Sequence, residues 1–315
     1  MSYSIVVPCY KSSKTIGKLV EQASAEMERL GRVPYEFILV NDCSPDDGET
    51  IRVLRELAEQ FSCVTVVDLA KNAGQHNATM AGFHYASGEY VICMDDDMQT
   101  HPSQLSILLD EIDKGYDVVY AYYPEKKHSL FRNFGSYFHY LTVRVLIGKP
   151  KELRTSSFVV LKKFVVENMI TYQHRYSYLQ GLILRTTRNI SCVPVKHFER
   201  EIGQSNYTLK SLIRLWGSII GFSIVPLRLC NYVGFSISFL SVLAAIFVFV
   251  RKVFFVPDMA IGWPSTIITV CLLFGLNFLF MGLIGEYIGR MFLGMNHEPQ
   301  YVVRDLIKQQ QESDV

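Results

Sequence analysis

A short apolar run that leads into three consecutive carboxylates constrains the fold of this chain more than any other feature. Residues 90–94 (YVICM) are followed at once by Asp95, Asp96 and Asp97, and a polar turn closes the run at 100–102. An apolar run of this length bounded by turn residues predicts a buried strand of a parallel sheet. Three acids at its end repel one another unless something cationic binds there. We therefore expect a binding edge at the carboxyl end of this strand.

These carboxylates have the chemistry of a divalent-metal site. Alternate residues of a strand face opposite sides, so we expect Asp95 and Asp97 to share a side while Asp96 turns away. With the amide oxygen of Gln99 they form an all-oxygen site suited to Mg²⁺ or Mn²⁺. Such ions commonly bind one or two carboxylates together with substrate phosphates. A solvated acidic turn is the alternative for an isolated Asp-x-Asp, and the preceding strand favours the metal site.

Strands alternate with helices through the first half of the chain. Strands are predicted at 4–7, 35–40, 64–67, 90–94, 118–122 and 156–161, and helices at 15–30, 49–61, 75–86 and 102–114. This alternation predicts an α/β domain with a doubly wound, mostly parallel sheet. Such sheets bind ligands at the carboxyl ends of their strands. The polar residues expected at that edge are Tyr10, Asp42, Asn72, Gly74, Asp95, Asp96 and Asp97.

The sequence contains neither a G-x-G-x-x-G motif after the first strand nor a P-loop. The phosphates of a bound nucleotide therefore need another cation, which an ion at Asp95 and Asp97 would supply. Asp42 could accept a hydrogen bond from the imide N–H of uracil, a donor that cytosine lacks. An Asx-turn or cap in the loop at 42–44 is the alternative role of this residue.

Four segments resemble the successive motifs of family 2 glycosyltransferases with the GT-A fold. They are VPCY at 7–10, VNDCSPD at 40–46, NAGQHN at 72–77 and MDDDMQ at 94–99. The resemblance implies that the donor nucleotide is lined by Pro8, Tyr10, Asp42, Asn72, Gly74, Asp95 and Asp96. It also implies that Asp95, Asp97 and Gln99 hold a divalent ion on the diphosphate, with Asp97 catalytic.

A later segment, 200–207, carries groups that can donate to phosphate oxygens. These are Arg200, Ser205 and Tyr207, and an arginine does so bidentately. The string alone could be a surface loop. It resembles the Arg-x-x-Gly-x-Ser-x-Tyr segment of the family 2 enzymes that use polyprenyl phosphate, such as bactoprenol glucosyltransferases and undecaprenyl-phosphate aminoarabinose transferases, with dolichol-phosphate mannose synthase more distant. The resemblance implies that these residues bind the acceptor phosphate, with Arg200 also catalytic.

One segment departs from that pattern. Bactoprenol glucosyltransferases carry an acid in a Gly-Asp-Phe-Arg-like segment, whereas the nearest match here, SSFV at 156–159, has neither the acid nor the arginine. No acceptor-side base is therefore assigned.

The C-terminal part is apolar enough to predict membrane attachment. The stretches 229–250 and 265–285 contain no charged residue, and each has roughly the 20 residues that a spanning helix needs. Basic residues flank their outer ends, so the positive-inside rule places the rest of the chain in the cytosol. The predicted units are a GT-A domain (1–208), an interfacial helix (209–228), a transmembrane hairpin (229–290) and a cytosolic tail (291–315). A helix at 131–147 could lie at the membrane surface or pack on the sheet.

Composition supports this interpretation. The 315 residues carry a formal net charge of +1, which argues against a nucleic-acid partner held by bulk charge. The 7 scattered cysteines indicate reduced thiols rather than a disulfide framework.

We expect an enzyme of the bacterial inner membrane that transfers a sugar, with inversion, from a nucleotide donor (UDP-linked) to undecaprenyl phosphate, for cell-envelope glycans. A homo-oligomer is left open. The alternatives are a processive polysaccharide synthase, whose Gln-x-x-Arg-Trp motif is missing, and a non-catalytic membrane scaffold.

Overall fold

Runs of β-branched and aliphatic residues form one mixed sheet in the computed structural model, which describes residues 1–124, 149–174, 177–196, 198, 225–254, 262–295 and 299–309. The strands are β1 (Tyr3–Cys9), β2 (Tyr35–Asn41), β3 (Val64–Leu69), β4 (Tyr90–Cys93), β5 (Val118–Tyr122), β6 (Val159–Lys162), β7 (Ile190–Pro194) and β8 (Val303–Lys308). Among the described residues they form an eight-stranded sheet in the order β7-β5-β6-β4-β1-β2-β3-β8. Strands β1 to β4 pair in parallel, as do β5 and β7. β6 is antiparallel to β4 and β5, and β8 is antiparallel to β3.

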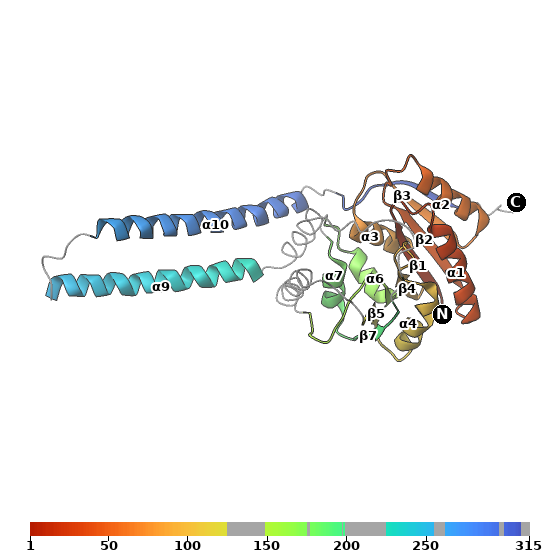
Figure 1. Cartoon of the computed structure of the whole chain (residues 1–315), viewed down its shortest axis with the longest axis horizontal. Coiled ribbons are helices and arrows are strands. Elements are labelled where there is room, and N and C mark those ends of the chain that lie inside the picture. The colour runs from red at the N-terminus through yellow and green to blue at the C-terminus, as the bar shows by residue number, and fades with distance from the viewer. Residues whose placement is uncertain are drawn as a thin grey trace.

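Helices cover both faces of this sheet (Figure 1). They are α1 (Ile16–Arg29), α2 (Glu49–Gln60), α3 (Gln75–Tyr85), the 3₁₀ turn η1 (Pro102–Gln104), α4 (Leu105–Ile112), α6 (Lys163–Ile170) and α7 (Leu179–Thr186). Alternate strand residues reach opposite faces, so Ile5 and Val7 pack with α1, α2 and α4 while Val6 packs with α3, α6 and α7. The two clusters form the two halves of the hydrophobic core.

The packing of α3 against β1 requires a glycine. A Cβ atom on Gly82 would lie 2.4 Å from Cγ1 of Val6, closer than real Cβ contacts allow. The absence of a side chain therefore lets the helix approach the strand, and this approach sets where the first residue of α3 lies at the edge of the sheet.

The observed elements differ from the predicted ones in several places. The predicted strand 156–161 begins only at Val159, because the Ser156 hydroxyl donates to the carbonyl of Ala121 (2.7 Å) ahead of the strand. The predicted helix 102–114 is divided into η1 and α4. The tail predicted at 291–315 contains β8, in which Arg304 pairs with Asp68 on β3 (3.5 Å).

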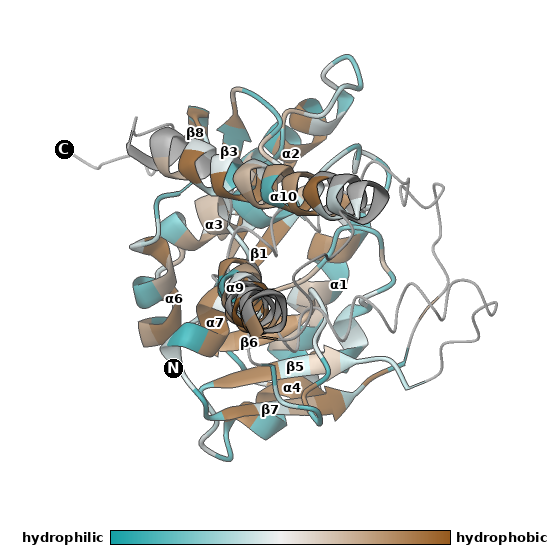
Figure 2. Cartoon of the chain, turned by 90° about the vertical axis from the view of Figure 1, so that its left-hand side faces the viewer, coloured by the Kyte–Doolittle hydropathy of each residue, from teal (hydrophilic) through white to brown (hydrophobic). Residues whose placement is uncertain are grey.

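Two long helices extend away from the sheet and lie side by side (Figure 1). They are α9 (Val225–Phe254) and α10 (Trp263–Met295). Large apolar side chains on both are exposed, including Phe235 at 74% and Phe278 at 69%, and Figure 2 shows hydrophobic residues along both helices. Within the described ranges, no helix reaches the combined length and apolarity required to cross a membrane. The transmembrane hairpin is therefore not confirmed, and the predicted helix at 131–147 and most of the one at 209–228 lie outside the described residues.

Candidate active site

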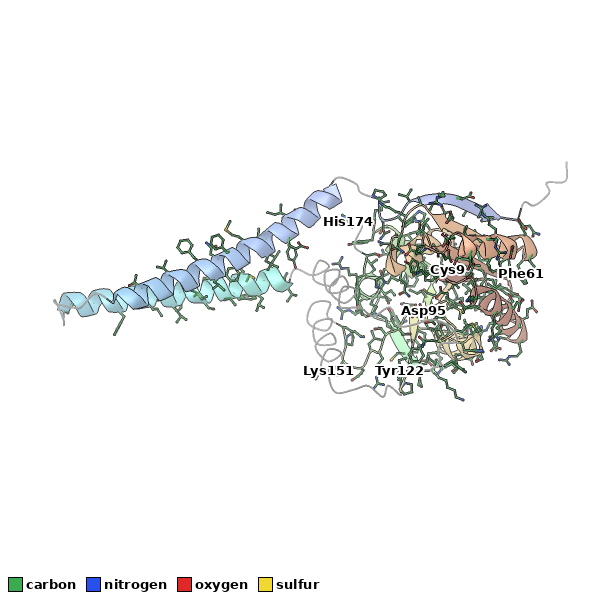
Figure 3. All side chains as sticks on the ribbon, turned by 45° about the horizontal axis from the view of Figure 1, so that its top comes forward. Cys9, Phe61, Asp95, Tyr122, Lys151 and His174 are labelled. Atoms are coloured by element: carbon green, nitrogen blue, oxygen red, sulfur yellow. The ribbon has the colours of Figure 1, made fainter. Side chains whose placement is uncertain are left out.

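The first carboxylate after β4 is held from two sides. Asp95 accepts a hydrogen bond at Oδ1 from Nε2 of Gln75 (2.7 Å), the first residue of α3. Its Oδ2 accepts one from the hydroxyl of Ser157, which precedes β6. In Figure 3 Asp95 lies between Cys9, at the end of β1, and Tyr122, at the end of β5. Two elements far apart in the sequence therefore fix the orientation of one carboxylate.

The second carboxylate faces a different neighbour. Asp96 accepts from the backbone N–H of Tyr10 (3.1 Å) and from the hydroxyl of Ser12, both in the segment after β1. Burial raises the pKa of Asp96, against the lowering effect of these two donors. Asp96 thus connects the loop after β4 to the loop after β1.

The third carboxylate, Asp97, and the first, Asp95, both affect the pKa of Tyr123. Asp97 accepts at Oδ1 from the backbone N–H of Gln99 (3.1 Å). Burial raises the pKa of Tyr123, which follows β5, and the negative charges of Asp95 and Asp97 raise it further. Both carboxylates are therefore close enough to Tyr123 to affect its ionisation.

The donor set fits a hard divalent ion that is completed by its substrate. Two carboxylates act on one region, and oxygen ligands are those that Mg²⁺ and Mn²⁺ prefer. In the part of the chain that the structure describes, no cluster of three or more His, Cys, Asp or Glu side chains could hold a metal. An ion bound at Asp95 and Asp97 would therefore take its remaining ligands from amide, phosphate and water oxygens.

Asp42, at the end of β2, organises the loop that leads into α3. Its carboxylate accepts from the backbone N–H groups of Ala73 (2.6 Å) and Gly74 (2.9 Å) and from Nδ2 of Asn72 (3.0 Å). Only 4% of Asp42 is exposed, and burial raises its pKa despite the two backbone donors. A carboxylate offers about four lone-pair sites, so one acceptor position remains for a ligand.

Gly74 is required by the backbone of this loop. It has φ 85° and ψ 154°, a combination that is essentially restricted to glycine. This conformation directs its N–H at Asp42 and begins α3 one residue later. The sequence-based interpretation of Asp42, Asn72 and Gly74 as ligand contacts missed this supporting role, although it weighed a local cap for Asp42.

The loops at this edge also carry left-handed backbone at residues other than glycine. Lys11 after β1 (φ 59°), Cys43 after β2 (φ 48°) and Met98 after β4 (φ 60°) all adopt it. Such conformations cluster at functional sites. Beside them Pro8 is buried within β1, and the side chain of Tyr10 is 41% exposed at the edge.

The predicted acceptor residues Arg200, Ser205 and Tyr207 lie outside the described residues. The site gains four residues that sequence analysis did not find, namely Gln75, Ser157, Tyr123 and Arg154. Gln75 and Ser157 contact Asp95, and the guanidinium of Arg154 lies 4.9 Å from the ring centre of Tyr122. Gln75 lies in the segment 72–77 and Ser157 in the segment 156–159, but neither segment gave them a role in the site. The pairing of β4, β5 and β6 brings Ser157, Tyr123 and Arg154 together.

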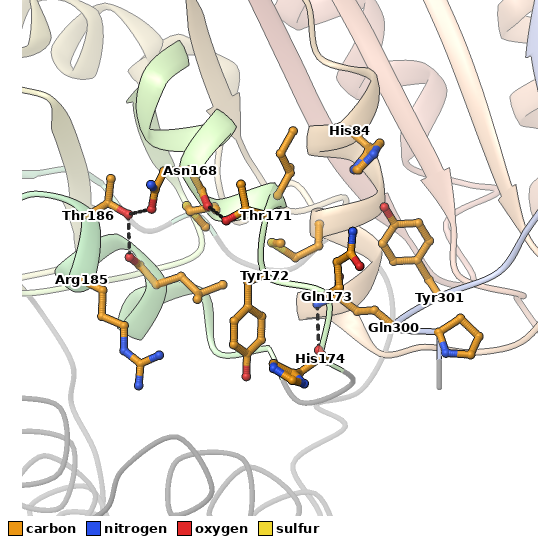
Figure 4. Close-up of a pocket in the computed structure, with 15 residues that line it drawn as sticks. His84, Asn168, Thr171, Tyr172, Gln173, His174, Arg185, Thr186, Gln300 and Tyr301 are labelled. Carbon is orange, nitrogen blue, oxygen red and sulfur yellow. Dashed lines mark hydrogen bonds between the residues drawn. The ribbon is translucent and has the colours of Figure 1, made fainter. Parts of the chain in front are cut away.

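A pocket of about 730 Å³ lies elsewhere, towards the opposite end of α3 from Gln75 (Figure 4). Its walls come from α3, α6, α7 and the segment before β8, and they include His84, His174 and Arg185. None of its described lining residues is a predicted site residue. This pocket is therefore separate from the carboxylate edge.

A family model described as glycosyl transferase family 2 matches residues 4–170. The chain belongs to glycosyl transferase family 2. Among its relatives, a Serratia proteamaculans protein named undecaprenyl-phosphate 4-deoxy-4-formamido-L-arabinose transferase is 33% identical over 310 residues, covering 98% of this chain and 94% of the relative. A protein of the same name from Yersinia enterocolitica is also 33% identical, with the same coverage.

Solved structures agree with the family 2 assignment at the level of the fold. Glucosyl-3-phosphoglycerate synthase from Mycobacterium tuberculosis, in complex with Mn²⁺, UDP and phosphoglyceric acid, superposes with a TM-score of 0.54 at 18% identity. The match covers 70% of this chain and 76% of that one. The predicted GT-A-like α/β fold and the predicted family are therefore confirmed, and the chain is a glycosyltransferase.

Proposed function

We propose that this family 2 enzyme transfers a sugar, with inversion, from a UDP-linked donor to undecaprenyl phosphate. The observation that carries the proposal is the pair of carboxylates after β4, Asp95 and Asp97, with Asp95 oriented by Gln75 and Ser157. Support for the acceptor comes from relatives that align over nearly the whole chain and whose names specify undecaprenyl phosphate.

The donor nucleotide would bind on the side of β1, β2 and β3. Asp42 has one acceptor position left after bonding its own loop, and the imide N–H of uracil could fill it. The exposed ring of Tyr10 lies at the same edge and offers a surface for a base. The M. tuberculosis structure of similar fold holds UDP and Mn²⁺, which agrees with this choice of donor.

Asp95 and Asp97, with the side chain of Gln99, would hold the Mg²⁺ or Mn²⁺ ion. Such an ion neutralises the charge that develops on the leaving diphosphate. The chain's own contribution is orientation, because Gln75 and Ser157 already fix both oxygens of Asp95. Asp96 holds the loop after β1 beside this site by accepting hydrogen bonds from Tyr10 and Ser12.

The acceptor needs positioning more than deprotonation. A phosphate monoester has a second pKa of about 6, so one of its oxygens is already a nucleophile at pH 7. This agrees with Ser157, rather than an acid, beside Asp95. We assign binding of the acceptor phosphate to Arg200, Ser205 and Tyr207, with attack on the anomeric carbon opposite the leaving diphosphate.

We further propose that α9 and α10 anchor the enzyme in the bacterial inner membrane, with the units 1–208, 209–228, 229–290 and 291–315 as predicted. The exposed apolar side chains of α9 and α10 and the uncharged stretches within them support this. A cysteine placed at position 261 should react with a membrane-impermeant reagent from the periplasm of intact cells, and one at position 310 should not. The reverse pattern would refute this topology.

The test of the function is UDP release by the full-length enzyme from a panel of UDP-sugars, with and without undecaprenyl phosphate. We expect release to depend on the lipid, and mass spectrometry should detect a sugar linked to its phosphate. Release that is equal without the lipid, or a growing polysaccharide, would refute the proposal. In the same assay Arg200→Ala should reduce transfer without weakening UDP binding, and Arg200→Lys should recover only part of the loss.

A further inference from the structure

The order of the strands divides the edge of the sheet that carries the aspartates into two sides, one on each side of Asp95. The ends of β1, β2 and β3 lie on one side, with Tyr10 and Asp42. The end of β5 and the beginning of β6 lie on the other, because β6 is antiparallel to both of its neighbours. If the donor nucleotide occupies the first side, an acceptor that attacks opposite the leaving diphosphate must approach from the second.

An exposed cation, Arg154, lies on that second side. The guanidinium of Arg154 is 4.9 Å from the ring centre of Tyr122, the last residue of β5. Among the described residues no carboxylate forms an ion pair with it. An exposed guanidinium that stacks on an aromatic ring keeps its N–H groups available in the plane of the group.

The chain places Arg154 close to the reacting groups. Ser157, three residues later, donates to Asp95, and three residues of extended chain span at most about 10 Å. Tyr123, next to the stacked Tyr122, is close enough to Asp95 and Asp97 for their charges to raise its pKa. The arginine therefore lies within side-chain reach of the edge that holds the carboxylates.

We propose that Arg154 binds the phosphate of the lipid acceptor and that Tyr122 holds its guanidinium in position. A guanidinium matches a phosphate with two parallel hydrogen bonds. This inference rests on the proposed function, because it presumes a phosphate acceptor and a donor nucleotide on the side of β1 to β3.

The experiment measures initial rates of the full-length enzyme against the concentration of a short-chain polyprenyl phosphate, together with UDP binding in the presence of Mn²⁺ by calorimetry. We expect Arg154→Ala to raise the KM for the lipid phosphate about tenfold, the loss of one charge-assisted contact, and to leave the Kd for UDP near the wild-type value. Arg154→Lys should recover part of the affinity. Tyr122→Leu should show part of the arginine's effect on the KM, since it removes the ring on which the guanidinium stacks.

Arg188→Ala is the matched control. Arg188 is also an exposed arginine, but it lies before β7, at the opposite end of the same part of the sheet. It should leave the KM unchanged. An unchanged KM in Arg154→Ala, or an equal rise in the Kd for UDP, would overturn the assignment. Absence of transfer to polyprenyl phosphate by the wild-type enzyme would instead overturn the proposed function, so the two failures are distinguishable.

Discussion

The two sides of the carboxylate edge are built differently. On the side of β1 to β3, Asp42 accepts three hydrogen bonds and Asp96 accepts two; three of the five come from backbone N–H groups and two from side chains. On the side of β5 and β6, one hydroxyl contacts Asp95 and an exposed arginine stacks on Tyr122. A rigid nucleotide is bound well by a preorganised site, because little ordering remains to oppose binding. A phosphate at the end of a flexible lipid binds more readily to an open surface that carries a cation.

The difference also concerns charge. Three aspartates follow β4, so any further carboxylate on the acceptor side would repel an incoming phosphate. Serine at position 157 orients Asp95 without adding charge. If the two sides act separately, a substitution on one side should leave binding on the other side unchanged.

Substitution of a carboxylate that both sides share should have the largest effect on transfer. Asp95→Asn or Asp97→Asn should lower transfer by more than about a hundredfold, because charge stabilisation at the leaving group is lost. Both variants should fold, since removing one acid relieves repulsion. Transfer assays and Mn²⁺ titration followed by electron paramagnetic resonance measure this. Asp47→Asn, the same change at an exposed position, is the control. Full wild-type activity in excess EDTA would contradict the prediction.

The second-largest effect is expected from a substitution on the nucleotide side, the side of β1 to β3. Asp42→Ala removes the acceptor of the Ala73 and Gly74 N–H groups, so the loop into α3 loses its anchor. We expect the Kd for UDP to rise roughly ten- to hundredfold, since one charged acceptor serves several donors. The KM for the lipid phosphate should stay near its wild-type value. Calorimetry with UDP and rates against lipid concentration separate the two. An equal effect on both substrates would show that the two sides are not independent.

Ser157 tests the acceptor side, with an effect of about tenfold. Ser157→Ala removes one donor to Asp95, so Mn²⁺ affinity and transfer should both fall by about that factor. Ser157→Asp should be slower than wild type, because the added carboxylate repels both Asp95 and the acceptor phosphate. Ser156→Ala is the control, since that hydroxyl donates to the carbonyl of Ala121 instead. A faster Ser157→Asp enzyme would mean that the reaction needs an acid or base at this position.

The sequence predicted this architecture where contiguous apolar runs mark buried strands, as in β1 to β5. It missed β8 because an edge strand with Arg304, Asp305 and Lys308 has no apolar pattern to recognise. Three adjacent acids after β4 are conspicuous in the sequence and were predicted to belong to the site, whereas Ser157 was given no role. That serine reaches Asp95 across 62 positions of sequence, through strand pairing that local patterns do not encode.

The smallest expected effect comes from His76, near the start of α3, and appears as a pH dependence of stability. His76 follows Gln75 in α3; its Nδ1 is buried without a hydrogen-bond partner, and burial lowers its pKa to about 4 from 6.5. Because the folded pKa lies below the unfolded one, its contribution to stability is present above about pH 6.5 and is lost progressively towards pH 4. Between pH 7 and 5.5 this should lower the free energy of unfolding by about 1 kcal/mol. Chemical denaturation in detergent should show a smaller loss over this interval in His76→Gln than in wild type. His84→Gln, at the exposed end of the same helix, should lose as much as wild type. If the two variants lose equal amounts of unfolding free energy, His76 is not the group whose protonation destabilises the protein at low pH.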